Sequence, residues 1–196
     1  MDLVIGDQSV FNDTIYWAKN MSSFFLPSSS LLTATDHPFH ISTTDLNGDL
    51  KTDIVYVLAG NRVCYRMNLG DGMWSAEILL KEGFINIRAI LCSDINLDGI
   101  IDVIVKDNSI GLSTIIMSDN LTISFIDSTD LSSSSVIALK INSVSGNPYP
   151  QIFYSDHEND FVSYFQTLNG SLGEITYLTH DCSEGRVHQI ADLNSD

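Results

Sequence analysis

The chain has 196 residues, of which 44% are apolar, so it is long enough and apolar enough to bury a core and is not a disordered segment. Its 25 acidic and 9 basic residues give a formal net charge of −16, which argues against nucleic acid or an anionic membrane as a partner. No stretch reaches the roughly 18 apolar residues of a membrane span, so we expect no membrane insertion within this segment.

The acidic residues are unevenly chosen, since 20 are Asp and 5 are Glu. Asp is unfavourable inside helices and favourable in turns and metal-binding loops, so this bias indicates a loop-rich β protein. The three cysteines, Cys64, Cys92 and Cys182, are odd in number and irregularly spaced. They therefore indicate neither a disulfide framework nor a zinc site, and their redox state stays open.

In chain order, short β-branched runs alternate with Gly, Asn, Asp and Ser, which is the chemistry of strands and turns. The chain opens on such a run at Asp2-Leu3-Val4-Ile5. In one later unit we expect strands near 41, 54–58, 62–67 and 74–80, and in the next at 86–92, 102–105, 113–117 and 121–126. No window keeps a 3.6-residue apolar period beyond about ten residues, so no helix is predicted.

A nine-residue acidic pattern stands between the first and second run of each unit. It reads Asp45-Leu46-Asn47-Gly48-Asp49-Leu50-Lys51-Thr52-Asp53, and again Asp94-Ile95-Asn96-Leu97-Asp98-Gly99-Ile100-Ile101-Asp102. It starts once more at Asp192-Leu193-Asn194-Ser195-Asp196, and a version without carboxylates occupies 143–151. The starts at 45, 94, 143 and 192 define a period of 49 residues, which indicates a repeat array.

Oxygen-bearing side chains at positions 1, 3, 5 and 9 of a loop, with a backbone carbonyl at position 7, suit calcium, which takes six to eight oxygen ligands. The predicted Ca²⁺ ligands are Asp45, Asn47, Asp49, the carbonyl of Lys51, Asp53, Asp94, Asn96, Asp98, the carbonyl of Ile100, Asp102, Asp192, Asn194 and Asp196.

The main alternatives to this metal loop are an EF-hand and a plain turn. An EF-hand needs Glu at position 12, where this chain has Tyr56 and Val105 inside strand-like runs. Asp, Asn and Gly also form turns without metal, and this alternative stays open. In the third copy Ser143, Ser145, Asn147 and Gln151 offer only neutral oxygens, so no ion is expected there.

The runs that follow each loop are apolar at successive positions, so we expect these strands to be covered on both faces. Four strands per unit of 40 to 50 residues are typical of a β-propeller blade. We predict an all-β propeller domain over 1–196, with about three complete four-stranded blades and partial blades at both ends. Because Asp2 matches position 9 of a loop and 192–196 match positions 1 to 5, we interpret the chain as a fragment of a longer array.

The pattern Asp-x-Asn-Gly-Asp-x-x-x-Asp before an apolar strand, with the turn Asn68-Leu69-Gly70-Asp71-Gly72, resembles the FG-GAP and VCBS repeats of integrin α-chain propellers and of many secreted or surface proteins. The resemblance implies a β-propeller with Ca²⁺ in the loop between the first and second strand of each blade. It also implies an extracellular or cell-surface location, and as partners a protein or glycan ligand at a propeller face and the other blades of the full-length chain.

For function we favour a calcium-binding, non-catalytic scaffold for binding or cell adhesion. The alternative is the propeller portion of a carbohydrate-binding or carbohydrate-active protein, such as a lectin or a polysaccharide lyase. The five histidines form no metalloprotease or catalytic-triad spacing, and no Gly-x-Ser-x-Gly motif occurs, so no catalytic residue is predicted. We expect aromatic residues such as Tyr65 and Trp74 to pack between blades rather than to stack on sugars.

Overall fold

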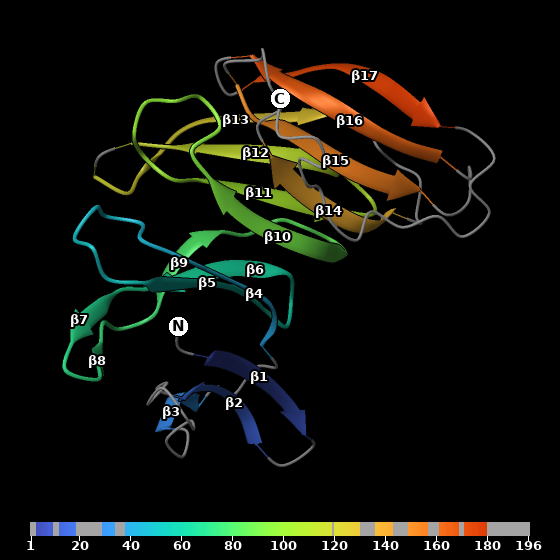
Figure 1. Cartoon of the computed structure of the whole chain (residues 1–196). Coiled ribbons are helices and arrows are strands. Elements are labelled where there is room, and N and C mark those ends of the chain that lie inside the picture. The colour runs from blue at the N-terminus through green and yellow to red at the C-terminus, as the bar shows by residue number, and fades with distance from the viewer. Residues whose placement is uncertain are drawn as a thin grey trace, which may run out of the picture. The chain divides into compact units, whose positions relative to one another are not determined.

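A computed structural model describes residues 3–9, 12–18, 29–33, 38–118, 120–129, 136–142, 149–156, 161–168 and 171–179. In this part of the chain every regular element is a β-strand, and no helix is present that could span a membrane. All paired strands are antiparallel (Figure 1). The prediction of an all-β chain is therefore confirmed for these residues.

The chain divides into two compact units, of which the first comprises Met1–Thr44 and Lys51–Gly83. It holds a three-stranded sheet in the order β1-β2-β3, a four-stranded sheet in the order β4-β5-β6-β9 and a small hairpin, β7-β8. The strands are β1 (Leu3–Ser9), β2 (Asn12–Ala18), β3 (Ser29–Thr33), β4 (Phe39–Thr44), β5 (Asp53–Leu58), β6 (Arg62–Arg66), β7 (Asn68–Gly70), β8 (Met73–Trp74) and β9 (Ile78–Lys81).

The second unit comprises Asp45–Leu50 and Phe84–Asp196. It holds two four-stranded meanders, in the orders β10-β11-β12-β13 and β14-β15-β16-β17. The strands are β10 (Ile87–Ser93), β11 (Asp102–Asp107), β12 (Gly111–Met117), β13 (Ile123–Thr129), β14 (Val136–Asn142), β15 (Gln151–Asp156), β16 (Phe161–Leu168) and β17 (Ser171–Thr179).

The strand register repeats with the 49-residue period of the sequence. The residue before each loop pairs with the residue at loop position 9, in the pairs Thr44 with Asp53, Ser93 with Asp102 and Asn142 with Gln151. In all three sheets the first strand also carries a bulge near its beginning. Four strands per period were predicted, and the three four-stranded sheets confirm this.

One predicted strand is divided in the structure. The expected run over 74–80 separates into β8 and β9, because Ser75 ties the chain back to the end of β6. Its N–H donates to the Met67 carbonyl (2.9 Å), and its Oγ accepts from the Met67 N–H (3.0 Å). These two hydrogen bonds of Ser75 interrupt the strand that the apolar sequence favours. A short hairpin, β7-β8, therefore precedes β9.

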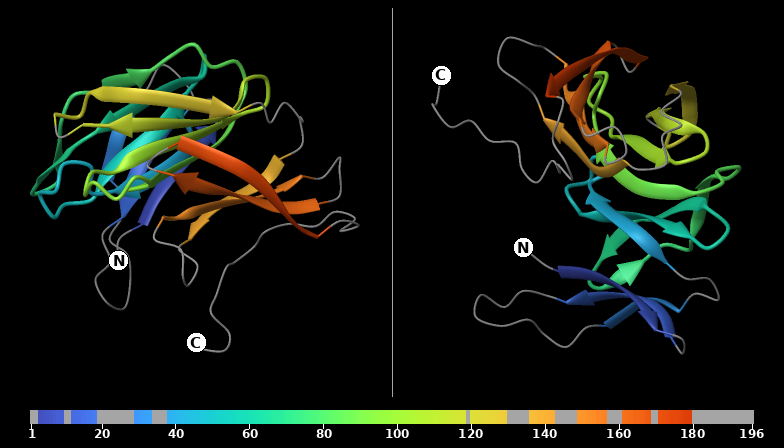
Figure 2. Two further views of the ribbon diagram at one scale, coloured as in Figure 1. Left: turned by 90° about the horizontal axis from the view of Figure 1, so that it is seen from above. Right: turned by 90° about the vertical axis from the view of Figure 1, so that its right-hand side faces the viewer.

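Every residue of the second strands β5 and β11 is buried, and so is every residue of the third strand β12. This confirms the expectation that the second strands are covered on both faces. Neighbouring sheets within a unit stack face to face (Figure 2). In the first unit Ile15 of β2 packs in one cluster with Ile54 and Tyr56 of β5.

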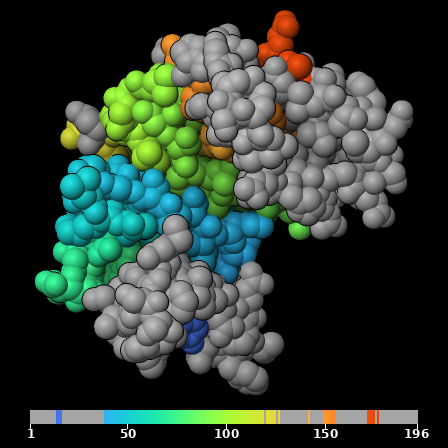
Figure 3. All heavy atoms as spheres, viewed as in Figure 1, coloured from blue at the N-terminus to red at the C-terminus, as the bar shows by residue number. Residues whose placement is uncertain are grey.

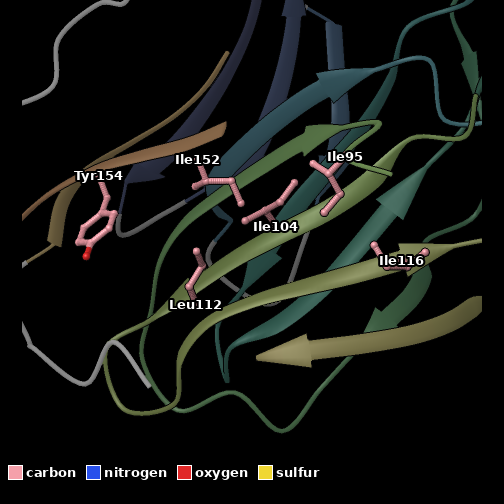
Figure 4. Packing of buried hydrophobic residues seen from close by; sticks show 6 residues of the cluster. All are labelled: Ile95, Ile104, Leu112, Ile116, Ile152 and Tyr154. Carbon is pink, nitrogen blue, oxygen red and sulfur yellow. The ribbon is translucent and has the colours of Figure 1, made fainter. Parts of the chain in front are cut away.

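The core of the second unit joins its two meanders (Figure 4). Its buried members are Ile95, Ile104, Leu112, Ile116, Ile152 and Tyr154. Ile104 belongs to one sheet and Ile152 to the other, so the side chains of facing sheets exclude water together. Each fully buried aliphatic side chain of this kind contributes about 1.5–3 kcal/mol to stability.

Candidate metal centre

The loop from Asp94 to Asp102 connects β10 to β11 and is closed by its own side-chain oxygens. Asp94 Oδ1 accepts from the N–H of Asp98 (3.2 Å) and Asp94 Oδ2 from the N–H of Gly99 (2.9 Å). Asn96 Oδ1 also accepts from the Asp98 N–H (3.1 Å), and Asp98 Oδ1 accepts from the Ile100 N–H (2.8 Å). The oxygens at positions 1, 3 and 5 are therefore folded back onto the loop, rather than extended into solvent.

The first six residues of the other complete loop, Asp45–Leu50, follow the same scheme. Asp45 Oδ1 accepts from the N–H of Gly48 (2.8 Å) and of Asp49 (3.1 Å), and Asp45 Oδ2 from the N–H of Leu50 (2.8 Å). Asn47 Oδ1 accepts from the Asp49 N–H (3.1 Å). In both loops, position 1 thus binds the N–H groups of positions 5 and 6, and position 3 binds that of position 5.

The backbone conformation is shared as well. Positions 4 and 6 have left-handed φ angles in both loops, at Gly48 (75°) and Leu50 (66°) in one and at Leu97 (62°) and Gly99 (88°) in the other. Glycine adopts this region without cost, whereas leucine is strained there by about 1–2 kcal/mol. Because glycine and leucine exchange places between the loops, the common conformation follows from the loop as a whole rather than from one glycine position.

Position 2 anchors each loop to the interior. Leu46 is 4% exposed and Ile95 is fully buried, although their neighbours in the loops are largely exposed. Ile95 belongs to the core cluster of its unit. The polar side chains that follow are therefore held at the surface, where Figure 3 shows both loops, in light blue and green.

Position 9 has a structural role that was not predicted. Asp102 is fully buried, and its two oxygens accept from the N–H of Ile95 (3.0 Å) and of Met117 (2.9 Å). In the first unit, buried Asp53 likewise accepts from the Asn68 N–H (2.7 Å). The spacing is 15 residues in both cases, so the last loop residue ties the second strand of the sheet to the end of the third.

In the second loop, the charges of neighbouring carboxylates affect the pKa of Asp102. The pKa of Asp102 is raised to about 6, chiefly by burial and also by the negative charges of Asp98 and Asp94, against the lowering effect of its two N–H donors. A buried carboxylate next to two others is stabilised by a nearby cation, which favours its ionised form.

The oxygen-only donor set fits a hard divalent ion, but the side chains are not gathered around one point. Among the described residues, no group of three His, Cys, Asp or Glu side chains is placed so as to hold a metal ion. The carboxylates of Asp94 and Asp98 bind backbone N–H groups instead, and Asn96 Nδ2 donates to Asp98 Oδ2 (2.8 Å). Coordination would therefore require these side chains to turn within the loop.

The remaining predicted ligands are only partly among the residues that the structure describes. Asp192, Asn194 and Asp196 lie outside the described residues, as do 143–148 of the third loop. At position 9 of the third loop, buried Gln151 donates from Nε2 to the Tyr149 carbonyl (2.9 Å), so its amide serves the local turn. Lys51 and Ile100 are in the loops as predicted, and the ligand role of their carbonyls stays a prediction.

A third buried carboxylate, Asp107, was not singled out by the sequence analysis. Asp107, at the end of β11, accepts from four backbone N–H groups, those of Ile85, Asn86, Ser109 and Ile110. Burial raises its pKa, but these donors together outweigh burial and hold the pKa below the usual range. The signal was present in the sequence, since Asp before an Asn-Ser pair after a strand is typical of a side-chain-closed turn.

Two further expectations can be compared with the structure. Tyr65 is 6% exposed, and half-buried Trp74 packs against the cluster around Ile54 and Tyr56. Burial is therefore confirmed for Tyr65, and packing between blades stays a prediction. Cys64 is buried and Cys92 half-buried, and neither forms a disulfide in the described part of the chain. Cys182 lies outside it.

In comparisons with known proteins, no family model matches the chain and no curated protein matches it. The resemblance to FG-GAP and VCBS repeats is therefore carried by the motifs alone.

Proposed function

We propose that this chain is a calcium-binding segment of a β-propeller of the FG-GAP and VCBS kind. It would act as a non-catalytic scaffold for binding or cell adhesion in a secreted or surface protein. In this proposal the stacked four-stranded sheets are blades. Asp94, Asn96, Asp98 and Asp102, with the Ile100 carbonyl, hold one ion, and the equivalent residues of the first loop hold another.

The observation that carries the proposal is the repetition of one strained loop conformation 49 residues apart. Two loops with different residues at positions 4 and 6 share left-handed φ angles, and in both the position 1 carboxylate accepts from the N–H groups of positions 5 and 6. A plain turn does not require leucine to be strained, and strain of this kind is concentrated at functional sites. A common ligand for both loops gives a reason for the shared conformation.

Calcium fits better than the other common ions. The donor atoms are carboxylate, amide and carbonyl oxygens, which disfavours zinc and copper. A loop that must turn several side chains toward the ion suits the flexible coordination of calcium better than the strict octahedron of magnesium. Ca²⁺ would also neutralise part of the net charge of −16. A scaffold role is supported by the absence of any catalytic motif in the sequence.

The proposal is tested by calcium binding and thermal melting of the protein after chelator treatment. We expect dissociation constants of about 10⁻⁴–10⁻³ M. At 10 mM Ca²⁺ each site then adds about 1.4–2.7 kcal/mol of stability, and chelation reverses the gain. Asp94→Ala and Asp45→Ala should each remove one site, whereas Asn147→Ala in the carboxylate-free third loop is the matched control and should leave the calcium content unchanged.

Two results would contradict calcium binding at these loops. If equilibrium dialysis finds no calcium on the wild-type protein at millimolar concentrations, the loops are turns closed by their own side chains. A melting temperature that rises equally in wild type and in the double variant at Asp45 and Asp94 would mean that calcium acts elsewhere.

A further inference from the structure

The loop Asp45–Leu50 contains the chemical elements of a spontaneous covalent modification. Asn47 is followed by Gly48, and among the residues that the structure describes it is the one asparagine followed by glycine. A backbone N–H after asparagine can attack the side-chain amide, and glycine permits the attack because it has no Cβ to obstruct the approach. Both residues are exposed, so water and base can reach them.

In the structure, hydrogen bonds fix both reacting groups in a way that slows this reaction. The nucleophile is the Gly48 nitrogen, whose hydrogen is donated to Asp45 Oδ1 (2.8 Å). The electrophile is Asn47 Cγ, and its Oδ1 accepts from the Asp49 N–H (3.1 Å), which fixes the orientation of the amide. Removing the Gly48 proton would leave a nitrogen anion facing the Asp45 carboxylate, so this carboxylate opposes the attack both as a hydrogen-bond acceptor and as a charge.

The second loop provides an internal comparison. Asn96 occupies the same position 3 and also accepts from the N–H of position 5, at Asp98 (3.1 Å). Its neighbour, however, is Leu97, whose side chain obstructs the approach of the backbone nitrogen. The two loops share a conformation but differ in this reactivity.

We propose that Asn47 is a site of deamidation and that Asp45 controls its rate by binding the Gly48 N–H. In the reaction hydroxide takes the Gly48 proton to form water, the nitrogen attacks Asn47 Cγ, and the N–Cγ bond forms. The Cγ–Nδ2 bond then breaks, and Nδ2 takes a proton from water and leaves as ammonia, which restores hydroxide. Water then opens the cyclic imide at either carbonyl, which gives aspartate or isoaspartate at position 47. No oxidant or further reactant is needed.

The product changes the loop in two ways. Either product places a third carboxylate between Asp45 and Asp49, where three negative charges repel one another. Isoaspartate also adds a methylene to the backbone, so the N–H groups of Gly48 and Asp49 no longer align with the Asp45 carboxylate. The modification therefore opens the first loop and leaves the second unchanged.

The test follows deamidation at 37 °C and neutral pH by peptide mass spectrometry, with chelator present so that the result is independent of calcium binding. In the wild-type chain, Asn47 should react faster than Asn96. It should nonetheless react at least about tenfold more slowly than in a synthetic peptide of residues 43–53, because one charge-assisted hydrogen bond corresponds to about this factor. Asp45→Ala should bring the rate in the protein close to that of the peptide.

Controls separate loop opening from unfolding. Asp45→Asn keeps an oxygen acceptor for the Gly48 N–H but loses the charge, so its Asn47 should react at a rate between those of the wild type and of Asp45→Ala. Asn96 reports on the rest of the fold and should react equally slowly in all variants. The proposal is overturned if Asn47 reacts no faster than Asn96, if the wild-type rate equals that of the peptide, or if Asp45→Ala leaves the Asn47 rate unchanged.

Discussion

Replacing Asp107 should be among the most damaging single changes in the second unit. Its Oδ2 accepts from the N–H of Ile85 (2.7 Å) and of Asn86 (2.8 Å), just before β10 begins. Its Oδ1 accepts from the N–H of Ser109 (2.7 Å) and of Ile110 (3.1 Å), in the turn between β11 and β12. One fully buried carboxylate therefore joins the entry of the sheet to its first turn.

The expected loss in the free energy of unfolding follows from the number and location of these N–H donors. Four hydrogen bonds to a charged group at about 1.5–3 kcal/mol each would give an upper bound of about 6–12 kcal/mol. Ile85, Ser109 and Ile110 are exposed, so water replaces part of the loss once the carboxylate is gone. We therefore expect Asp107→Ala to lower the free energy of unfolding by about 3 kcal/mol. Asp107→Asn should cost about 2 kcal/mol, because its NH₂ faces two N–H donors.

Urea unfolding at several pH values checks this estimate. The pKa of Asp107 is held below its unfolded value near 4, so its charge stabilises the fold above that pH, and the benefit is lost as the pH falls through the folded pKa. The difference between wild type and Asp107→Asn should thus shrink below about pH 4. A loss under about 1 kcal/mol at pH 7, or an equal difference at pH 7 and pH 3, would refute the reasoning.

Three further predictions concern the loops. Leu97→Gly should raise the free energy of unfolding, measured by urea denaturation, by about 0.5–1 kcal/mol. The change removes the strain of a left-handed leucine at a smaller cost in chain entropy. An unchanged free energy of unfolding would mean that Leu97 is not strained. Calcium affinity of the second loop should fall about tenfold from pH 7 to pH 5, because protons compete at Asp102, whose pKa burial raises to about 6. Dialysis that shows no pH dependence would exclude Asp102 as a ligand. Removal of calcium by a chelator should raise the hydrogen-exchange rate of the Met117 N–H. An equal exchange rate with and without calcium would show that ion binding does not affect β12.

The periodic part of the molecule was accessible from the sequence. The 49-residue spacing and the continuous apolar runs predicted four-stranded sheets whose second strands are covered on both faces, and β5 and β11 are buried throughout. Such patterns are readable because strand burial depends on the local apolar sequence and is repeated in each unit. The loop positions were likewise located correctly between the first and second strands.

What the sequence did not disclose are bonds between distant residues. The bond from the Met117 N–H to Asp102 depends on the register between β11 and β12. The role of Asp107 depends on two segments more than twenty residues apart. Periodicity gave a divided signal at Asp107, because the third repeat has Asp156 at the equivalent position, whereas the first has Leu58, which is buried as an apolar side chain. The division of the expected strand over 74–80 was also missed, since it follows from Ser75 binding the Met67 backbone.

The residue at position 9 gives each acidic loop a connection to the sheet beyond it. Asp102 binds the N–H of Ile95 inside the loop and that of Met117 at the end of β12, so loop closure and strand position depend on the same carboxylate. At the same position of the third repeat, Gln151 donates from Nε2 to the Tyr149 carbonyl, and it carries no charge. A cation that attracts the carboxylate of Asp102 would therefore act on β12, whereas Gln151 has no carboxylate for a cation to attract. Under the proposed function, this difference would confine ion dependence to the units whose position 9 is aspartate, while the strand register is the same in all three four-stranded sheets.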